Sequence, residues 1–195
     1  MDDYRCGMAR GRGSVVAIGL ALVALTGCIG ATTRDDFDEE VRARGGGLTS
    51  TFVDDSLAAI AAEYDVADWR TLSALSLVIQ PGDRLVTATV RDPARLDFVD
   101  TKVVVDAEVR STTPLQDAGD LPLDAITFPL GSVAIVPVEP LATAALDAFG
   151  EEGGFVQSMA ASLTAGEVTI RVDLESARRT ATATFDAEGT LVGLD

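Results

Sequence analysis

The sequence contains no histidine. Histidine is the most frequent metal ligand in proteins and the most frequent general base in enzymes. Its absence excludes Ser-His-Asp and Cys-His catalytic arrangements, and it removes the ligand that most transition-metal sites need. We therefore expect no catalytic residues, no metal ligands and no cofactor.

Lysine and tryptophan each occur once, as Lys102 and Trp69. The alternation of residues around Lys102 places it on the outward face of a strand, where we expect a solvated charge rather than a catalytic amine. Trp69 is predicted to be an anchor in the core or at a domain edge rather than a ligand platform. A phosphate-binding loop is also missing, because Gly45-Gly46-Gly47 lacks both the spacing and the following Lys-Ser/Thr.

Carboxylates are the remaining candidates for catalytic groups, because the chain has 31 acidic residues. A glycoside hydrolase uses two of them, but it also needs aromatic sugar platforms and a deep cleft, and one tryptophan is a poor basis for these. The acidic run at 35–40 lacks the regular Asp-x-Asp-x-Asp-Gly spacing of a calcium loop. The sequence therefore predicts a protein that is not an enzyme and that holds no metal.

The apolar run from Val15 to Leu25 is too short for a transmembrane helix. Three arginines precede it, and the tetrapeptide Leu25-Thr26-Gly27-Cys28 closes it. A basic start, a short apolar run and small residues at its end are the layout of a secretory signal peptide. Residues 1–27 are therefore predicted to be a leader that is removed.

Leu25, Thr26, Gly27 and Cys28 resemble the lipobox of bacterial lipoproteins, both in residue type and in their place behind the apolar run. The resemblance implies cleavage before Cys28 and a diacylglycerol joined to the Cys28 thiol. The protein would then be held on the extracytoplasmic side of the cell membrane. Cys6 leaves with the leader, so no disulfide is expected in the mature protein. The alternative is an ordinary cleaved signal peptide followed by an incidental cysteine.

Removal of residues 1–27 leaves 168 residues, enough for one ordinary domain or two small modules. The whole chain has a formal charge of −16, and loss of the leader's three arginines and two aspartates leaves −17. Such a surface repels nucleic acid and anionic lipid headgroups. We expect no nucleic-acid partner, a polar tether over 28–47, and membrane attachment through the lipid on Cys28.

Two helices are predicted beyond the tether. Apolar residues at i, i+3, i+4 and i+7 mark one helix over 57–64 and another over 141–148. Glu139-Pro140 is a start signal for the second helix, and Gly150 is a stop signal. The sequence thus repeats a helical segment at a spacing of about 84 residues.

Period-2 alternation predicts strands that follow each helix in the same order. These strands cover 86–90 and 103–109 in the first half, and 168–172 and 180–185 in the second half. A further strand is expected before each helix, around 48–53 and 133–136. A short helical or irregular piece is expected after each helix, around 69–75 and 155–161.

The sequence therefore predicts an α+β fold of two tandem modules, 48–128 and 129–195, each a helix packed on a small antiparallel β-meander. The phrases Ala74-Leu75-Ser76-Leu77 and Ala160-Ala161-Ser162-Leu163 occupy matching places in the two modules. The prolines within 111–128 argue against a central strand there and mark the joint.

The second half, from Gly166-Glu167-Val168 to Asp186-Ala187-Glu188-Gly189-Thr190-Leu191, resembles small exported modules of the PepSY type. Those modules pack a helix on an antiparallel sheet whose late strand ends in a polar turn. Glu188-Gly189-Thr190 fits such a hairpin turn, with glycine accepting a positive φ. The resemblance implies a non-catalytic extracytoplasmic module that binds, inhibits or senses.

The function expected from these features is the binding of a protein or an envelope component. The sheet faces of two modules would form a continuous concave surface, and the acidic exterior would steer cationic partners towards it. The alternative is a lipid or glycolipid carrier similar to exported mycobacterial-type lipoproteins, which needs a large apolar cavity. The Ala-rich helix faces favour a filled core instead. The sequence identifies no ligand-binding residues.

Overall fold

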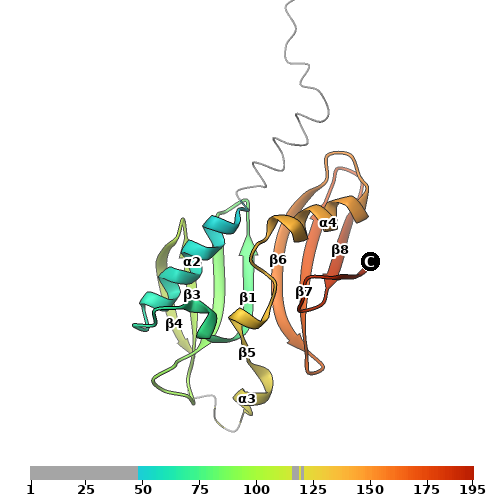
Figure 1. Cartoon of the computed structure of the whole chain (residues 1–195). Coiled ribbons are helices and arrows are strands. Elements are labelled where there is room, and N and C mark those ends of the chain that lie inside the picture. Colours follow the sequence, from blue (N-terminus) through green and yellow to red (C-terminus); the bar gives the residue numbers. More distant parts are fainter. Residues whose placement is uncertain (1–47, 116–118, 120) are drawn as a thin grey trace, which may run out of the picture. The chain divides into compact units, whose positions relative to one another are not determined.

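The computed structural model describes residues 48–115, 119 and 121–195. This part of the chain has an α+β fold, as predicted: helices lie on one antiparallel sheet (Figure 1). The helices are α2 (Ser50–Ala62), α3 (Leu123–Ile126) and α4 (Glu139–Phe149), with 3-10 turns η2 (Trp69–Thr71) and η3 (Leu130–Ser132). The strands are β1 (Ser73–Gln80), β2 (Leu85–Arg91), β3 (Val99–Val105), β4 (Glu108–Leu115), β5 (Phe128–Pro129), β6 (Phe155–Thr164), β7 (Glu167–Glu175), β8 (Thr180–Phe185) and β9 (Leu191–Leu194).

The sheet runs in the order β4-β3-β2-β1-β6-β7-β8-β9, and the short β5 pairs with the start of β1. The order of elements in the chain, a helix and then a four-stranded meander, occurs twice: α2 precedes β1–β4, and α4 precedes β6–β9. The first strands of the two meanders, β1 and β6, pair antiparallel in the middle of the sheet. The two matching phrases lie on these strands, and Ser76 is paired with Ser162.

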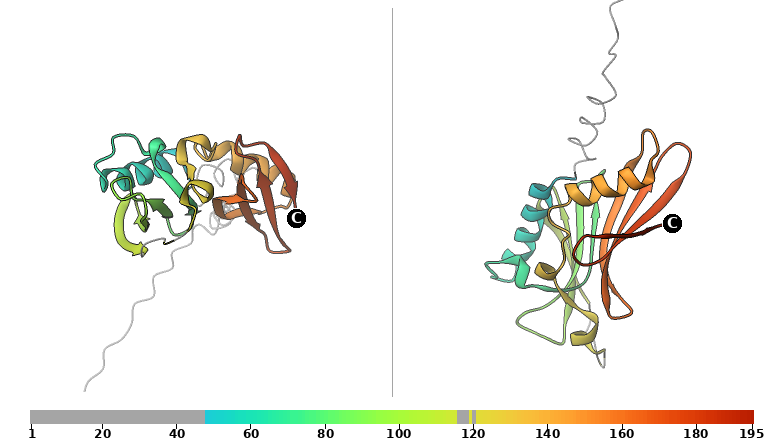
Figure 2. Two further views of the ribbon diagram at one scale, coloured as in Figure 1. Left: turned by 90° about the horizontal axis from the view of Figure 1, so that it is seen from below. Right: turned by 45° about the vertical axis from the view of Figure 1, so that its right-hand side comes forward.

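The two long helices cover the same face of the sheet (Figure 2). On that face Leu77 of β1 lies beside Ala161 of β6, and Ile79 lies beside Met159; all four are fully buried. Leu57 and Ile60 of α2 belong to the same core cluster, as do Leu141, Ala145 and Phe149 of α4. The two halves therefore share one sheet and one hydrophobic core, and the division into two modules stays a prediction.

Helix boundaries follow from local capping. Thr49 precedes α2 in an extended conformation, and its hydroxyl accepts the Phe52 N–H at 3.2 Å. In α4, proline occupies the first turn, and Gly150 closes the helix at φ 66°, donating its N–H to Leu146 O at 3.0 Å. The predicted start and stop of the second helix are confirmed.

Several local predictions were wrong. Residues 50–53 begin α2 instead of forming a strand, because Thr49 supplies an N-cap three residues before Phe52. Residues 133–136 form turns, yet Val133 and Ile135 are buried in the core between the two helices. Residues 155–161 are part of the long strand β6, held by β1 and β7. Ala107 is not a strand residue: Asp106 and Ala107 make the β3–β4 turn with positive φ.

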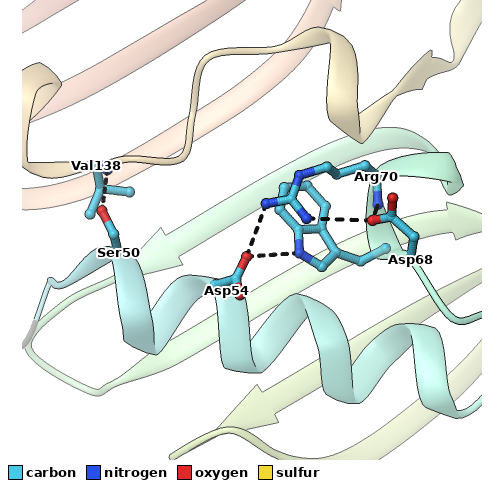
Figure 3. A network of polar contacts seen from close by, with 6 residues as sticks. Ser50, Asp54, Asp68, Arg70 and Val138 are labelled. Atoms are coloured by element: carbon cyan, nitrogen blue, oxygen red, sulfur yellow. Dashed lines mark hydrogen bonds and ion pairs between the residues drawn. The ribbon is translucent and has the colours of Figure 1, made fainter.

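Trp69 is buried with 6% of its surface exposed and belongs to the core cluster, as predicted. Its indole N–H donates to Asp54 Oδ1 at 2.9 Å, which ties η2 to α2 (Figure 3). The Arg70 guanidinium stacks 4.3 Å from the indole centroid and also reaches Asp54 and Asp68. Trp69 thus anchors the turn that leads into β1.

The first turns of α2 and α4 bind each other. The Glu139 carboxylate accepts both the backbone N–H of Ser50, at 2.8 Å, and the Ser50 hydroxyl proton. The Ser50 hydroxyl in turn accepts the Val138 N–H at 3.0 Å. Burial alone would raise the pKa of Glu139, but the hydrogen bonds from Ser50 lower it below its ordinary value. These contacts, here named the helix clamp, cap two helices that begin 89 residues apart.

Replacing Ser50 with alanine should lower the free energy of unfolding by about 1 kcal/mol, because its hydroxyl joins the two helices by donating to Glu139 and accepting the Val138 N–H. The measurement is the urea midpoint of the soluble 29–195 form. Thr51→Ala is the matched control, since Thr51 is exposed one position along the same helix. A Ser50→Ala, Glu139→Gln cycle should give a combined loss smaller than the sum of the single losses. Additive losses would contradict the clamp.

Candidate functional site

The face of the sheet opposite α2 and α4 presents a distinct set of side chains, and we call it the uncovered face because, among the described residues, these two helices pack on the other side. Along β2, Val86, Ala88 and Val90 point to the helices and are fully buried. The alternate residues Thr87 and Thr89 point the other way and are only half-buried. The same alternation along β1, β6, β7 and β8 assigns the residues of this face.

Four neighbouring strands, β3, β2, β1 and β6, contribute no charged side chain to the middle of the uncovered face. Their described charged residues are Asp100 and Lys102, both buried on the helix side, and Arg91 at the end of β2. We name this area the neutral face. Its residues are Thr101, Val103, Val105, Leu85, Thr87, Thr89, Ser76, Val78, Gln80, Ser158, Ala160, Ser162 and Thr164. A charge-free area this wide is unexpected in a chain with 24% charged residues and a net charge of −16.

A row of hydroxyl side chains crosses six strands of the uncovered face. Each member is the direct cross-strand partner of the next, so neighbours are about 4.8 Å apart along the row. The row consists of Thr113, Thr101, Thr89, Ser76, Ser162 and Thr169. The Thr89 and Thr101 hydroxyls are 3.2 Å apart and hydrogen-bond each other. The row offers hydrogen-bond donors and acceptors in a regular line beside the aliphatic Val78 and Val103.

Asp173 of β7 lies at the border of the neutral face. Its Oδ2 accepts the Ser158 hydroxyl of β6 at 2.7 Å, and its Oδ1 accepts the Thr182 hydroxyl of β8 at 2.9 Å. Side chains from both neighbouring strands therefore fix the direction of the carboxylate. Each oxygen keeps a further lone pair, so the group can still accept from a cationic donor.

Lys102 is a correction to the sequence analysis, because it faces the helices and is only 4% exposed. Its ammonium lies 4.5 Å from the Tyr64 ring centroid and 3.8 Å from Glu63 Oε2. The Tyr64 hydroxyl donates to Asp100 Oδ2 at 2.9 Å, and burial together with this carboxylate raises the pKa of Tyr64. Asp100 and Lys102 are tolerated on the helix side of β3 because the end of α2 places the Tyr64 ring and the Glu63 carboxylate beside them.

The loop after β2 is organised by a second buried carboxylate. Asp92 Oδ1 accepts the backbone N–H groups of Ala94 and Arg95 at 2.8 and 3.1 Å, and Oδ2 accepts Arg95 Nε at 2.7 Å. Burial would raise the pKa of Asp92, but these hydrogen bonds outweigh it and lower the pKa below its ordinary 3.8. Every contact shapes the loop itself, so we assign Asp92 a structural role.

The remaining sequence predictions concern a hairpin turn, the lipobox-like residues, metal ligands and membrane-spanning helices. Glu188-Gly189-Thr190 forms the expected hairpin turn, with Gly189 at φ 83° and the Thr190 N–H on Asp186 Oδ1 at 2.7 Å. Leu25, Thr26, Gly27 and Cys28 lie outside the described residues. Among residues 48–115, 119 and 121–195, histidine, cysteine, aspartate and glutamate form no group of three suited to a metal ion. No helix within this same part is long and apolar enough to cross a membrane.

The sequence identified no ligand-binding residues, and it did not predict the neutral face. One signal was readable: 73–80 and 155–164 contain no charged residue. Local sequence does not show that these two segments lie side by side, because β1 and β6 pair residues that are 80 to 86 positions apart in the chain.

No protein-family model and no curated protein sequence matches the chain. The resemblance to PepSY modules therefore stays a prediction. One crystal structure is similar in fold: CD1622 of Clostridium difficile 630, a protein provisionally described as a lipoprotein. The similarity has a TM-score of 0.50 at 10% sequence identity and covers 70% of this chain and 86% of that chain. At this identity the similarity concerns the fold alone.

Proposed function

We propose that the protein is a lipid-anchored extracytoplasmic lipoprotein that binds a protein or envelope component through the neutral face. The lipobox-like Leu25-Thr26-Gly27-Cys28 supports the anchor, and the fold similarity to a protein described as a lipoprotein agrees with it. The binding role rests on one observation: β3, β2, β1 and β6 place no charged side chain in the middle of the uncovered face.

The centres of protein interfaces are depleted in charged residues, whereas a solvated surface usually intersperses both signs of charge. On this chain the charges concentrate elsewhere, on the helices, the loops and β7. Hydroxyl and small aliphatic side chains lose little conformational freedom on contact, so they form an area that a partner can cover at low entropic cost. Non-catalytic binding is the activity that this surface supports.

The proposal includes the internal duplication. It is supported by the repeated order of a helix and four strands and by the pairing of Ser76 with Ser162, which occupy the same place in the two matching phrases. Under this arrangement the module 48–128 supplies β3, β2 and β1 of one binding face, and the module 129–195 supplies β6. A lipid carrier, the alternative, would need an apolar cavity between helices and sheet. Phe52, Leu57 and Ile60 of α2 instead pack into the core cluster with the sheet.

Thr89→Arg should abolish partner binding, because it places a long cation in the middle of the neutral face. Ala58→Arg is the matched control: it adds the same charge to an exposed position of α2. Each variant, as the soluble 29–195 form, is used to isolate binding partners from an envelope extract of its own host, with quantification by mass spectrometry. A partner retained by the wild type and by Ala58→Arg but lost with Thr89→Arg supports the proposal. Equal recovery with all three proteins contradicts it, provided that their melting temperatures agree.

A further inference from the structure

Strand β7 places two charges at the border of the neutral face, Arg171 opposite Ala160 and Asp173 opposite Ser158, and hydrogen bonds fix the direction of the Asp173 carboxylate. The carboxylate of Asp173 is held from both sides by the Ser158 and Thr182 hydroxyls at 2.7 and 2.9 Å. These three residues belong to three adjacent strands, β6, β7 and β8. A charged group whose direction is set before binding loses little entropy when it pairs, which is the property of a strong anchor point.

Different parts of the chain would attract a partner and contact it. The chain as a whole is strongly acidic, with a net charge of −16, and this field acts over about 10 Å at ordinary ionic strength. The contact area itself is neutral, and charges lie at its border, among them Asp173 and Arg171 of β7 and Arg91 of β2. A cationic partner is therefore attracted from a distance and is then held by hydrogen bonds, apolar contacts and one charge pair.

We infer that the partner is a basic protein that presents an arginine or lysine side chain to Asp173 and lays an uncharged surface over β3, β2, β1 and β6. This inference rests on the proposed function and names the partner's chemistry. The hydroxyls of Ser158 and Thr182 leave the outer lone pairs of the carboxylate available for such a donor. A partner that covers the neutral face also shields this pair from water, and a charge-assisted hydrogen bond is then stronger than in bulk water.

Other occupants fit these observations less well. Nucleic acids and anionic lipid headgroups are repelled by the acidic chain. A neutral glycan leaves Asp173 without a cationic donor. A second copy of this chain brings another acidic surface, so the long-range field would oppose its approach.

The test compares three variants of the soluble 29–195 form. Asp173→Asn removes the charge and keeps the shape of the side chain; the amide oxygen still accepts from one hydroxyl, and the amide N–H donates to the other once that hydroxyl rotates. Asp55→Asn removes the same charge from an exposed position of α2. Thr89→Arg reports on the neutral face itself. Partners from the envelope extract are identified, and each is then purified and titrated against all variants by biolayer interferometry at two salt concentrations.

The expected result is a partner of net positive charge whose Kd rises about 10- to 100-fold with Asp173→Asn and less than twofold with Asp55→Asn. Added salt should slow its association much more than it speeds its dissociation. If Thr89→Arg abolishes binding while Asp173→Asn and Asp55→Asn behave alike, the inference fails and the proposed function stands. If the species lost with Thr89→Arg is a glycan, a lipid, an acidic protein or the chain itself, the inference also fails. If no species depends on Thr89, the proposed function fails too.

Discussion

Cys28→Ser should move the protein from the membrane fraction to the soluble fraction. The diacylglycerol proposed on Cys28 would bury two acyl chains, and each buried methylene stabilises membrane attachment by about 0.8 kcal/mol. The acidic surface cannot replace that attachment, because anionic headgroups repel it. The measurement is fractionation of host cells followed by a high-salt wash and an immunoblot.

The chain supplies a matched control for this experiment. Cys6→Ser makes the same chemical change within the predicted leader and should leave the protein with the membranes. A Cys28→Ser protein that still sediments with membranes after the salt wash would show that the lipobox interpretation is wrong or that a second anchor exists. Loss of attachment in both variants would point to a defect of export rather than of lipidation.

Separating the two halves should abolish cooperative folding of each. The piece 121–195 on its own exposes the β6 edge that pairs with β1, together with Met159, Ala161 and Ile135, which are fully buried in the whole chain. A domain this small with a split core rarely has enough buried apolar surface to fold alone. We expect no cooperative thermal transition for the isolated piece by circular dichroism.

The control is the nicked protein. A protease site placed between Pro114 and Pro122 should yield two pieces that stay associated after cleavage and melt together, because β1 still pairs with β6 and the core is intact. An isolated 121–195 piece with its own sharp melt would instead establish an independent second module. In that case the β1–β6 contact would be an interface between domains rather than the centre of one core.

Local sequence signals were most reliable where one residue controls the backbone. Pro140 and Gly150 bound α4 at the predicted positions, because proline suits a first helical turn and glycine accepts the left-handed conformation. The strand predicted over 180–185 is β8, and its alternating Ala181, Ala183 and Phe185 are the buried residues of that strand. Apolar periodicity alone was less informative at 155–161, where an Ala-rich stretch fits a helix or a buried strand equally well.

By itself, the sequence determined what this protein lacks and how its segments prefer to fold. The absence of histidine, the single lysine, the acidic composition and the lipobox-like tetrapeptide are all properties of the linear chain. Only the tertiary structure decided which segments are neighbours. Pairing of β1 with β6 joined two uncharged strands into one neutral face, and pairing of β7 with its neighbours placed two hydroxyls on Asp173. The same packing buried Lys102, whose alternation suggested an exposed charge. The physical reason is that periodicity reports the conformation of one segment, whereas neighbours distant in sequence are chosen by burial of the whole core.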